Sequence, residues 1–471
     1  MNINKCIPLS GLLLSVSLGM QGANLNAHEK RPNVMIILLD DAGYNDFGFM
    51  GSKDIQTPQI DKLCSQGVLL INGYVSASVS GPSRAGILSG RYQQRFGYEC
   101  NLGDTLGMAL GEQTIGNVFQ RNGYATACIG KWHQGNAPKY HPNLRGFDYF
   151  YGFLAGGRHY FYQPDGDDKP GSARNLQLNG TQQRFSGYLT DVLADGAINF
   201  LQKNDKPFMM YLAFNAVHTP LEATDEDLKR FEGHPRQLLA AMTWAVDRAI
   251  GKVIHQLEIS GQMDNTLLFF LSDNGGAHDN QSSNYPLKGF KGNKYEGGIH
   301  VPFFVVWKKH LEEGGRFDGL VSSLDIFSTA VSSANVQMDS LSRPLDGVNL
   351  LPFLTKKQQG NPHHKLFWRK GNMAAVRIGN YKLIRANGLG ERMYDLSIDG
   401  EEEFDLCTQE KSLYSELNRE LLEWEKKLIK PLWTEGEDWD KVTFEIYKDL
   451  MNNHAVRYKS PSQLKQKENQ F

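Results

Sequence analysis

The stretch NVMIILLDDAG, residues 33–43, decides the fold class of this chain. Its apolar residues follow one another without a break from Val34 to Leu39, and two aspartates come directly after them. An apolar run without alternation indicates a strand buried on both faces, the kind found in parallel sheets. Similar runs recur as PFMMYLAFNAVH (residues 207–218), NTLLFFLSDNGG (265–276) and HVPFFVVW (300–307). The sequence therefore predicts several strands of one buried sheet.

Helical patterns lie between these apolar runs. Thr57 and Pro58 form a typical helix start, with threonine as the cap and proline at the first position. The segment 236–261 has helical spacing, with apolar residues at Leu239, Met242, Val246, Ile250, Val253 and Leu257. Gly261 is a suitable stop. Strands that alternate with helices predict an α/β fold around a large, mostly parallel sheet flanked by helices.

The character of the sequence changes after about residue 355. LTKKQQGNPHHK (354–365) is polar and suits a boundary loop, and short amphipathic strands follow in AAVRIGNYKLIRA (374–386) and RMYDLS (392–397). A charged helix is expected from about residue 412 to 429. We expect a catalytic domain over residues 28–355, a smaller C-terminal α+β domain over 363–450 and a polar tail over 451–471.

The N-terminus resembles an export signal. Lys5 precedes GLLLSVSLGM (11–20), which is too short to span a bilayer, and Ala27 suits a cleavage site. The alternative is a buried terminal strand or helix. A signal over residues 1–27 predicts an exported protein, periplasmic or secreted, without a membrane span.

Composition and cysteine spacing exclude some functions. The chain of 471 residues has a formal net charge of −2, which gives no general basic field for nucleic acid or membrane surfaces. Cys64, Cys100, Cys128 and Cys407 form no CxxC pair, so a thiolate metal site is not expected. Disulfides could form in an oxidising compartment, but the spacing does not assign them.

Polar residues follow two of the predicted strands. Asp40 and Asp41 end the first, while Asp273 and Asn274 end another, ahead of two glycines. Sites in open α/β sheets form beyond the carboxyl ends of strands, and four oxygen ligands suit calcium or magnesium. Either pair alone is equally well explained as a turn signal.

Cationic and titratable groups stand in three further stretches. IGKWHQG (129–135) contains Lys131 and His133, FNAVHTP (214–220) contains His218, and LKGFKGNKYEGGIHVP (287–302) contains Lys291. Taken singly, a histidine is more often structural, and a lysine among glycines more often belongs to a solvated loop. SVSGPSRAGILSGR (78–91) adds a serine, a proline and an arginine close together, which suits either a turn into a helix or an anion site.

Together these stretches resemble the formylglycine-dependent type I sulfatases of the alkaline phosphatase superfamily. The family signature is matched by Ser80-Gly81-Pro82-Ser83-Arg84 followed by Leu88-Ser89-Gly90-Arg91. The resemblance extends through DDAGYNDFGFMG (40–51), TPQIDKL (57–63), GKWHQG (130–135), RGFDYFYGF (145–153), SDNGG (272–276), RIGNYKLIR (377–385) and MYDLSID (393–399). It implies an alkaline phosphatase-like fold and the hydrolysis of sulfate monoesters.

The resemblance also implies how the site works. Ser80 would be oxidised to formylglycine, whose hydrated aldehyde attacks sulfur and then expels sulfate through its second hydroxyl. Arg84 would hold the diol oxygens. Asp40, Asp41, Asp273 and Asn274, with residue 80, match the ligands of one calcium ion per chain.

The remaining roles are carried over in the same way. Lys131 and Lys291 match the lysines that bind the sulfate and neutralise charge in the transition state. His218 is the expected acid for the departing alcohol, and His133 the expected base for the second hydroxyl. The two histidine roles are interchangeable at this level.

Two positions depart from the common family pattern. Ser80 stands where many members have cysteine, so a bacterial host with an anaerobic, serine-type maturase is expected; otherwise serine replaces cysteine in an inactive variant. His300 stands where relatives often carry arginine, which would alter the rim of the site.

The substrate is expected to be a sulfated carbohydrate. Arg158 and His159, in GFLAGGRHYFYQ (152–163), are candidates for sugar contacts, and Trp368 and Arg369 could add others; packing or surface roles are the alternative for each. The sugar, the position of the sulfate, and exo or endo action stay open. A phosphoester hydrolase of the same superfamily and a non-catalytic binder of sulfated glycans, with Ser80 unmodified, are the alternative functions.

Overall fold

The computed structural model describes residues 31–101, 103, 105–339 and 343–468. Its main sheet has ten strands in the order β10-β2-β9-β8-β1-β7-β3-β4-β5-β6. Their bounds are β1 (Asn33–Leu39), β2 (Val68–Tyr74), β3 (Ala125–Lys131), β4 (Tyr149–Phe153), β5 (Gln177–Leu178), β6 (Thr181–Gln182), β7 (Phe208–Ala213), β8 (Thr266–Ser272), β9 (Phe303–Val306) and β10 (Gly315–Ser322). The central pairs β8–β1, β1–β7, β7–β3 and β3–β4 are all parallel, whereas β9 runs antiparallel to both β2 and β8.

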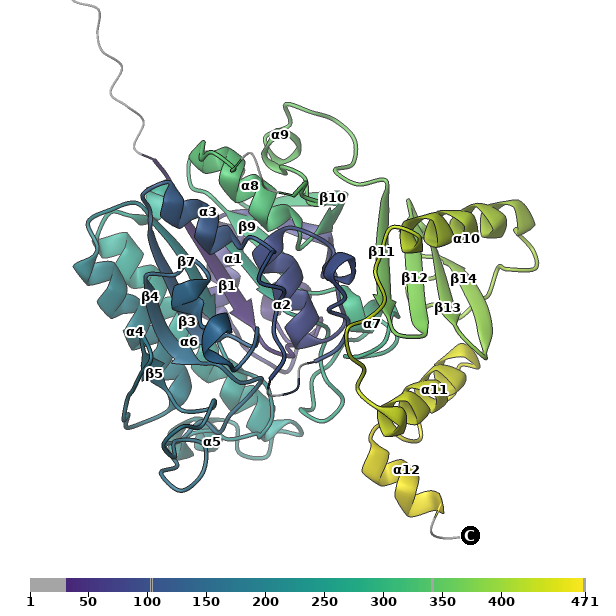
Figure 1. Cartoon of the computed structure of the whole chain (residues 1–471), viewed down its shortest axis with the longest axis horizontal. Helices are drawn as coiled ribbons and strands as arrows, with labels where there is room; N and C mark the ends of the chain where they lie inside the picture. Colours follow the sequence, from purple (N-terminus) through teal and green to yellow (C-terminus); the bar gives the residue numbers. More distant parts are fainter. Residues whose placement is uncertain (1–30, 102, 104, 340–342, 469–471) are drawn as a thin grey trace, which may run out of the picture. The chain divides into compact units, whose positions relative to one another are not determined.

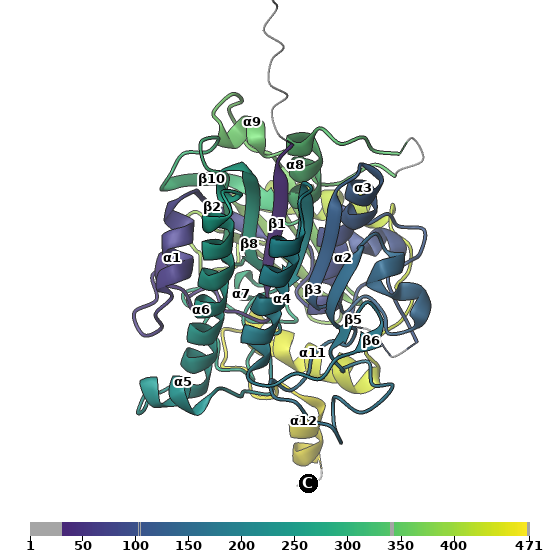
Figure 2. The same ribbon diagram turned by 90° about the vertical axis from the view of Figure 1, so that its left-hand side faces the viewer.

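Helices cover both faces of this sheet. They are α1 (Pro58–Ser65), α2 (Ser80–Ser89), α3 (Ile115–Arg121), α4 (Leu189–Lys203), α5 (Asp225–Arg230), α6 (Gln237–Ile259), α7 (Glu296–Ile299), α8 (Asp325–Ala334) and α9 (Leu351–Leu354). Figure 1 shows the sheet between them, and in Figure 2 helices α1, α4 and α6 lie in front of it while α2, α3 and α8 lie behind. Side chains that alternate along β1 therefore enter two cores: Val34, Ile36 and Leu38 one, Met35, Ile37 and Leu39 the other.

A second, smaller sheet follows in the C-terminal part. Its antiparallel strands run in sequence order, with β11 (Lys365–Lys370), β12 (Met373–Ile378), β13 (Tyr381–Ala386) and β14 (Gly390–Asp395). Helices α10 (Lys411–Glu425), α11 (Glu437–Met451) and α12 (Pro461–Glu468) follow these strands, and α10 lies against the sheet in Figure 1. The predicted fold class, a mostly parallel sheet flanked by helices with a smaller α+β domain, is confirmed.

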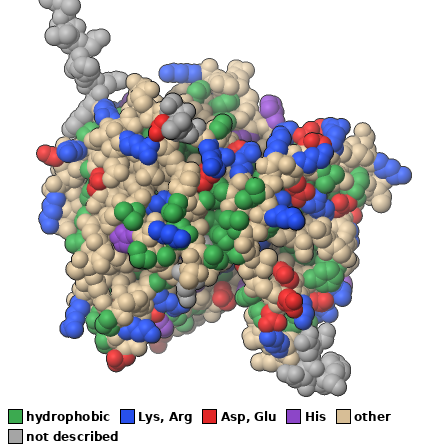
Figure 3. Space-filling view, in the orientation of Figure 1, with side chains coloured by type: hydrophobic (Ala, Val, Ile, Leu, Met, Phe, Trp, Pro, Cys, Tyr) green, Lys and Arg blue, Asp and Glu red, His purple; other side chains and the backbone are tan. Residues whose placement is uncertain are grey.

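The ends of the chain and its surface bear on two further predictions. The predicted signal over residues 1–27 lies outside the described residues, and the predicted polar tail contains the helix α12. None of the described helices combines the length and the apolar character that a bilayer crossing requires. Acidic and basic side chains are interspersed over the face shown in Figure 3, in keeping with a net charge of −2.

Candidate active site

The two polar strand ends named in the sequence meet at one edge of the sheet. Strands β1 and β8 are parallel neighbours whose last residues, Leu39 and Ser272, are paired. Asp40–Asp41 and Asp273–Asn274 follow directly, and all four residues are buried. Asp41 has a φ of 60°, which turns the backbone out of the strand and brings its amide to 3.2 Å from Oδ1 of Asp273. The register of two parallel strands therefore assembles the acidic centre.

Ser80 points into this centre from the first position of helix α2. Its side-chain oxygen donates to Oδ1 of Asp40 at 3.0 Å and to Oδ1 of Asn274 at 3.3 Å. Asn274 donates in turn through Nδ2 to Oδ1 of Asp41 at 2.8 Å. Every residue of α2 is buried, and Ser80 itself is 1% exposed. The side chain at position 80 is thus held among oxygen atoms at the positive end of a helix dipole.

Arg84 lies one helical turn after Ser80, on the same face of α2. Its Nε donates to Oδ2 of Asp273 at 2.9 Å, and its Nη2 lies 2.8 Å from the same oxygen and 3.6 Å from Oδ1 of Asp40. Nη2 makes no hydrogen bond that meets geometric criteria among the described residues. The guanidinium therefore fixes two carboxylates and keeps a buried donor for another oxygen.

Two lysines bind the adjacent aspartates. Lys131, the last residue of β3, places its Nζ 2.5 Å from Oδ2 of Asp40, and Lys291 places its Nζ 2.7 Å from Oδ2 of Asp41. Burial acts to raise the pKa of both carboxyls, but Lys131 and Lys291 respectively lower it below the ordinary value. Burial lowers the pKa of the Lys131 ammonium, whereas Asp41 raises that of Lys291 despite burial. Both aspartates stay ionised at neutral pH.

The two histidines differ in how they are held. His218 has its Nδ1 2.6 Å from the carbonyl oxygen of Thr219, which can only accept, so the proton sits on Nδ1 and Nε2 faces Oδ2 of Asp41 at 3.6 Å. His133 has no partner for its Nδ1 among the described residues. Burial, together with Lys131 and Arg84, lowers the pKa of His133 well below its usual range. His133 is therefore a neutral imidazole with a free ring nitrogen.

Several oxygen atoms that could bind a metal ion surround Ser80. Asp40, Asp41, Asp273 and Asn274 supply carboxylate and amide oxygens, the ligands that calcium prefers. Within the described part of the chain, Asp40, Asp41 and His218 offer ligand atoms that all lie within 4.8 Å of one another. The donor set fits a hard divalent cation.

Two cavities open beside this centre. The larger, of about 1140 Å³, is lined by both histidines and by Gly156, Gly157 and Thr219; we call it the histidine cavity. The smaller, of about 500 Å³, is lined by Val79 and Lys291 on one side and by α11 on the other; we call it the C-terminal cavity. Both volumes are of the order that ligand pockets usually have.

Three of the peripheral candidates make contacts within the protein. Arg158 is fully buried, and its guanidinium donates to the carbonyls of His159 and Arg174 and to Asp168, so it braces the loop at the wall of the histidine cavity. Trp368 is 1% exposed and donates to the carbonyl of Val75, and Arg369 pairs with Glu99. These side chains have the packing roles that the sequence left as the alternative.

His300 does not lie at the rim of the site. Its ring stacks on Tyr74 at a centroid distance of 4.6 Å, and its nitrogens bond Glu296 and the carbonyl of Ile71. The imidazole therefore belongs to the protein interior. His159, by contrast, is partly exposed and bonds Glu222 through Nδ1 at 2.7 Å.

Three residues that support the centre were missed from the sequence. Asn280 is fully buried and donates to the carbonyls of Asp41 at 3.0 Å and Val217 at 3.1 Å, while Ser282 donates to the same Asp41 carbonyl. Asn101 accepts a hydrogen bond from the amide of Gly81, next to Ser80. They fix the backbone of Asp41 and of the α2 start. No local pattern distinguishes these side chains from ordinary loop residues.

The fold and the buried centre, in which acidic strand ends face the start of α2, define a hydrolase of the alkaline phosphatase superfamily. The model of the Sulfatase family matches residues 32–336, and the chain belongs to that family. It is a sulfuric ester hydrolase, and the resemblance noted from the sequence is confirmed.

Curated relatives and solved structures agree with this assignment. The chain is 34% identical over 395 residues to the uncharacterized sulfatase YdeN of Escherichia coli (strain K12), covering 72% of this chain and 68% of the relative. It is 29% identical over 407 residues to N-acetylgalactosamine-6-sulfatase of Mus musculus, covering 80% and 76%. The crystal structure of Ps i-CgsB superposes with a TM-score of 0.81 at 36% identity, covering 86% of this chain and 95% of that one.

Proposed function

We propose that the enzyme removes sulfate from a sulfated carbohydrate, with Ser80 converted to formylglycine and one calcium ion held by Asp40, Asp41, Asp273, Asn274 and residue 80. The observation that carries this proposal is the position of the Ser80 oxygen, 3.0 Å from Asp40 and 3.3 Å from Asn274, with two lysines on the adjacent carboxylates. Calcium would lower the pKa of a bound hydroxyl and polarise a sulfate oxygen. The hydrated aldehyde would supply one hydroxyl for attack and a second for release.

The chain's own cations bind the sulfate in this proposal. Lys131, Lys291 and Arg84, each paired with an aspartate of the centre, would hold the sulfate oxygens beside residue 80 and neutralise their growing charge. The three carboxylates balance these three cations, so a bound calcium ion would make the centre net positive, which suits an incoming sulfate.

The histidines move the protons. The Thr219 carbonyl holds the His218 ring through Nδ1–H, so in its doubly protonated, imidazolium form the ring would present Nε2–H to protonate the departing alcohol oxygen. His133, kept neutral by burial, would accept the proton from the second hydroxyl. The different settings of the two rings favour this assignment over the exchanged one.

The histidine cavity is the place proposed for the sugar that carries the sulfate. His133 and His218 line it beside the glycines of residues 156–157, and His159 lies in the next part of that loop. Ps i-CgsB, at 36% identity, has been solved in complex with k-i-k-neocarrahexaose, which supports a saccharide substrate here. We further propose a bacterial host, export by the N-terminal segment, and an anaerobic maturase for Ser80.

The test combines mass spectrometry with a paired assay. The tryptic peptide that contains Ser80, isolated from the native host, should be lighter by about two hydrogens, since formylglycine is an oxidised serine. The same protein should release sulfate from 4-nitrophenyl sulfate much faster than phosphate from 4-nitrophenyl phosphate. An unmodified peptide in a fully active preparation would overturn the formylglycine proposal, and the reverse preference would overturn the choice of sulfate.

A further inference from the structure

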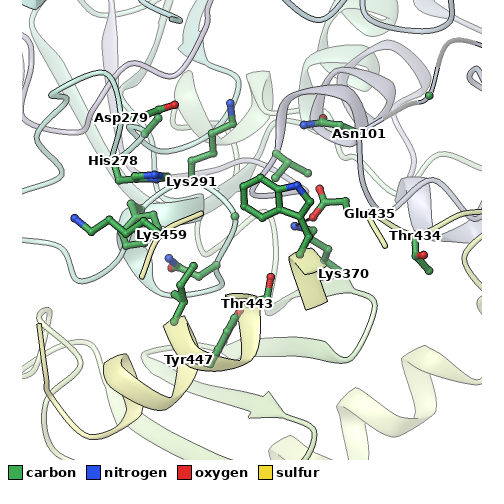
Figure 4. Close-up of a pocket in the computed structure, with 18 residues that line it drawn as sticks. Asn101, His278, Asp279, Lys291, Lys370, Thr434, Glu435, Thr443, Tyr447 and Lys459 are labelled. Atoms are coloured by element: carbon green, nitrogen blue, oxygen red, sulfur yellow. Dashed lines mark ion pairs between the residues drawn. The ribbon is translucent and has the colours of Figure 1, made fainter. Parts of the chain in front are cut away.

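The C-terminal cavity is a second place where the reacting centre meets the outside of the protein. Its walls come mainly from the loop of residues 277–293 and from α11 with the segments on either side of it; Val79, Asn101, Gly103 and Lys370 complete them. Figure 4 shows His278, Lys291 and Lys459 on one side of this cavity and Lys370 and Glu435 on the other. The proposed function makes no use of it.

The two cavities approach the same carboxylate from different sides. Lys291 lines the C-terminal cavity and lies 2.7 Å from Oδ2 of Asp41, while His218 lines the histidine cavity and lies 3.6 Å from that oxygen. Val79, the residue before Ser80, also lines the C-terminal cavity. A molecule with its sulfate at residue 80 could therefore extend into both cavities.

The outer wall of the C-terminal cavity is attached to residues 288–294, which contain three lysines and which we call the lysine loop. Tyr447 of α11 is fully buried and accepts a hydrogen bond from the amide of Lys294 at 2.9 Å. Lys288 of the same loop donates to the carbonyl of Glu402 at 2.7 Å and to the side chain of Asn453, just beyond α11. The cavity is pre-formed, as ligand pockets usually are.

An aromatic ring and an unpaired cation are its most available groups. Trp439 has 41% of its surface exposed, and its indole N–H makes no hydrogen bond within the described chain. Lys459 lies over the ring of Phe290 at 5.8 Å and forms no ion pair there. Lys370 is neutralised by Glu435 at 2.6 Å, and Lys291 by Asp41.

The cavity wall also contains His278 and Asp279, which lie next to each other and interact. His278 packs its ring on Phe290 at 5.3 Å and interacts electrostatically with the exposed Asp279. Lys459 therefore remains as the cation without a close carboxylate among the described lining residues. Trp439 offers an apolar face with a donor at its edge, a suitable surface for a sugar ring.

We propose that the C-terminal cavity binds a second sugar of the same saccharide, with its ring on Trp439 and an anionic group, sulfate or carboxylate, at Lys459. This inference rests on the proposed function. Because the saccharide would then continue on both sides of residue 80, the enzyme acts on sulfate esters within a chain and not only at its end.

The experiment compares substrates of increasing length. Trp439→Ala and Lys459→Ala are assayed for kcat/KM on 4-nitrophenyl sulfate and on sulfated di-, tetra- and hexasaccharides prepared from carrageenan and from chondroitin sulfate. Each variant should lose about tenfold more on the hexasaccharide that the wild type accepts than on 4-nitrophenyl sulfate, which corresponds to about 1.4 kcal/mol of binding. Lys459→Arg should recover most of the loss.

The matched control is Lys441→Ala, an exposed lysine of α11 that does not line the cavity, and it should change no rate. Activity on 4-nitrophenyl sulfate measures the fraction of correctly folded sites. Equal losses on short and long substrates, or release of terminal sulfates alone by the wild type, would overturn the second-sugar inference and leave the proposed function standing. No release from any saccharide, with 4-nitrophenyl sulfate still cleaved, would overturn the carbohydrate proposal itself.

Discussion

The protein contains two buried clusters of charged residues, one at the reacting centre and one between the two sheets. Both contain lysine, arginine, histidine and carboxylate side chains, but they differ in their surroundings. We call the second the junction cluster; it consists of Lys382, Glu296, Glu402, His300, Tyr74 and Arg377. Lys382 lies 2.7 Å from Glu296 and 2.9 Å from Glu402, and so joins β13 of the small sheet to α7 beside the main one. Glu296 also accepts from Tyr74 at 2.5 Å and contacts His300 at 3.0 Å.

The difference between the clusters lies in what they face. Lys291, His133 and His218 of the reacting centre line cavities. No residue of the junction cluster lines either of the two cavities among the described residues. Buried ion pairs stabilise a fold only weakly in net terms, because desolvation offsets their attraction. A cluster of buried charges beside a cavity is therefore a candidate active site, whereas a cluster without a cavity is interpreted as a structural contact between the two sheets.

The largest effect is expected at Ser80. Ser80→Ala should abolish sulfate release, by at least about 10⁴-fold, because a covalent nucleophile cannot be replaced by its neighbours. The melting temperature should change by only a few degrees, since the side chain is small. Sulfate release under single-turnover conditions and thermal unfolding measure the two quantities. Turnover at the wild-type rate would contradict a covalent role.

Removal of the metal ion should cause the second-largest loss of activity. Exhaustive chelation should lower the rate by more than about 100-fold, since the ion supplies much of the charge stabilisation at the sulfate. Added calcium should restore it, and elemental analysis should find one ion per chain. Full activity in a protein shown to be metal-free would rule out this part of the proposal.

Two substrates with different leaving groups can separate the role of His218 from that of the lysines. His218→Ala should lose about 10²–10⁴-fold on a sulfated sugar, whose alkoxide needs a proton, and far less on 4-nitrophenyl sulfate. Lys131→Ala should instead lose similar amounts on both substrates, because the proposal places Lys131 on the sulfate, which both substrates share. Single-turnover formation of the sulfated enzyme is the measurement. Equal losses for His218→Ala would transfer the acid role to His133.

A substitution in the junction cluster should lower the stability of the protein and leave its activity nearly unchanged. Lys382→Met removes the ammonium between two buried carboxylates and should cost about 3–5 kcal/mol of unfolding free energy, the usual result of breaking a buried pair. The rate per folded molecule should change little, since these residues line neither cavity. Denaturant unfolding and active-site titration give the two values. A large loss of rate at unchanged stability would make the junction part of the active site.

The smallest expected effect is a pH dependence at Glu402. Burial raises the pKa of Glu402 to about 7, although Lys382 acts to lower it, from a usual value of 4.5. Between those values the folded state binds more protons than the unfolded one, so the contribution of Glu402 to stability is complete below pH 4.5 and is lost as the pH rises through 7. The slope is at most about 1.4 kcal/mol per pH unit. Glu402→Gln should remove it from unfolding curves measured between pH 5 and 8.

Much of the fold and the acidic centre could be predicted, because the relevant information is local. The apolar run from Val34 to Leu39 requires a doubly covered strand, and the carboxyl ends of parallel strands share one edge. The polar residues after β1 and β8 therefore had to come together. The left-handed backbone of Asp41 and the Asn280 bonds that support it depend on tertiary contacts, so no spacing rule finds them.

The side-chain contacts around the cavities depend on tertiary structure for a related reason. A sequence shows that Arg158 lies in a polar loop but not whether its guanidinium points inward, and Asp168 and two carbonyls decide that it does. Trp439 and Lys459 lie near Lys291 only because Tyr447 fixes α11 to the lysine loop. Contacts between segments so far apart are set by packing.

The burial of Ser80 has a consequence for the order of events in the cell. All ten residues of α2 are buried, so a second protein could not reach the side chain once this helix has packed. The proposed oxidation would have to precede folding, on a chain still extended. Maturase added to purified folded protein should then have no effect, and the same protein should be converted only after denaturation. The fraction of active enzyme would then depend on whether the maturase acts before the chain folds, and not on the affinity of the maturase for the folded enzyme.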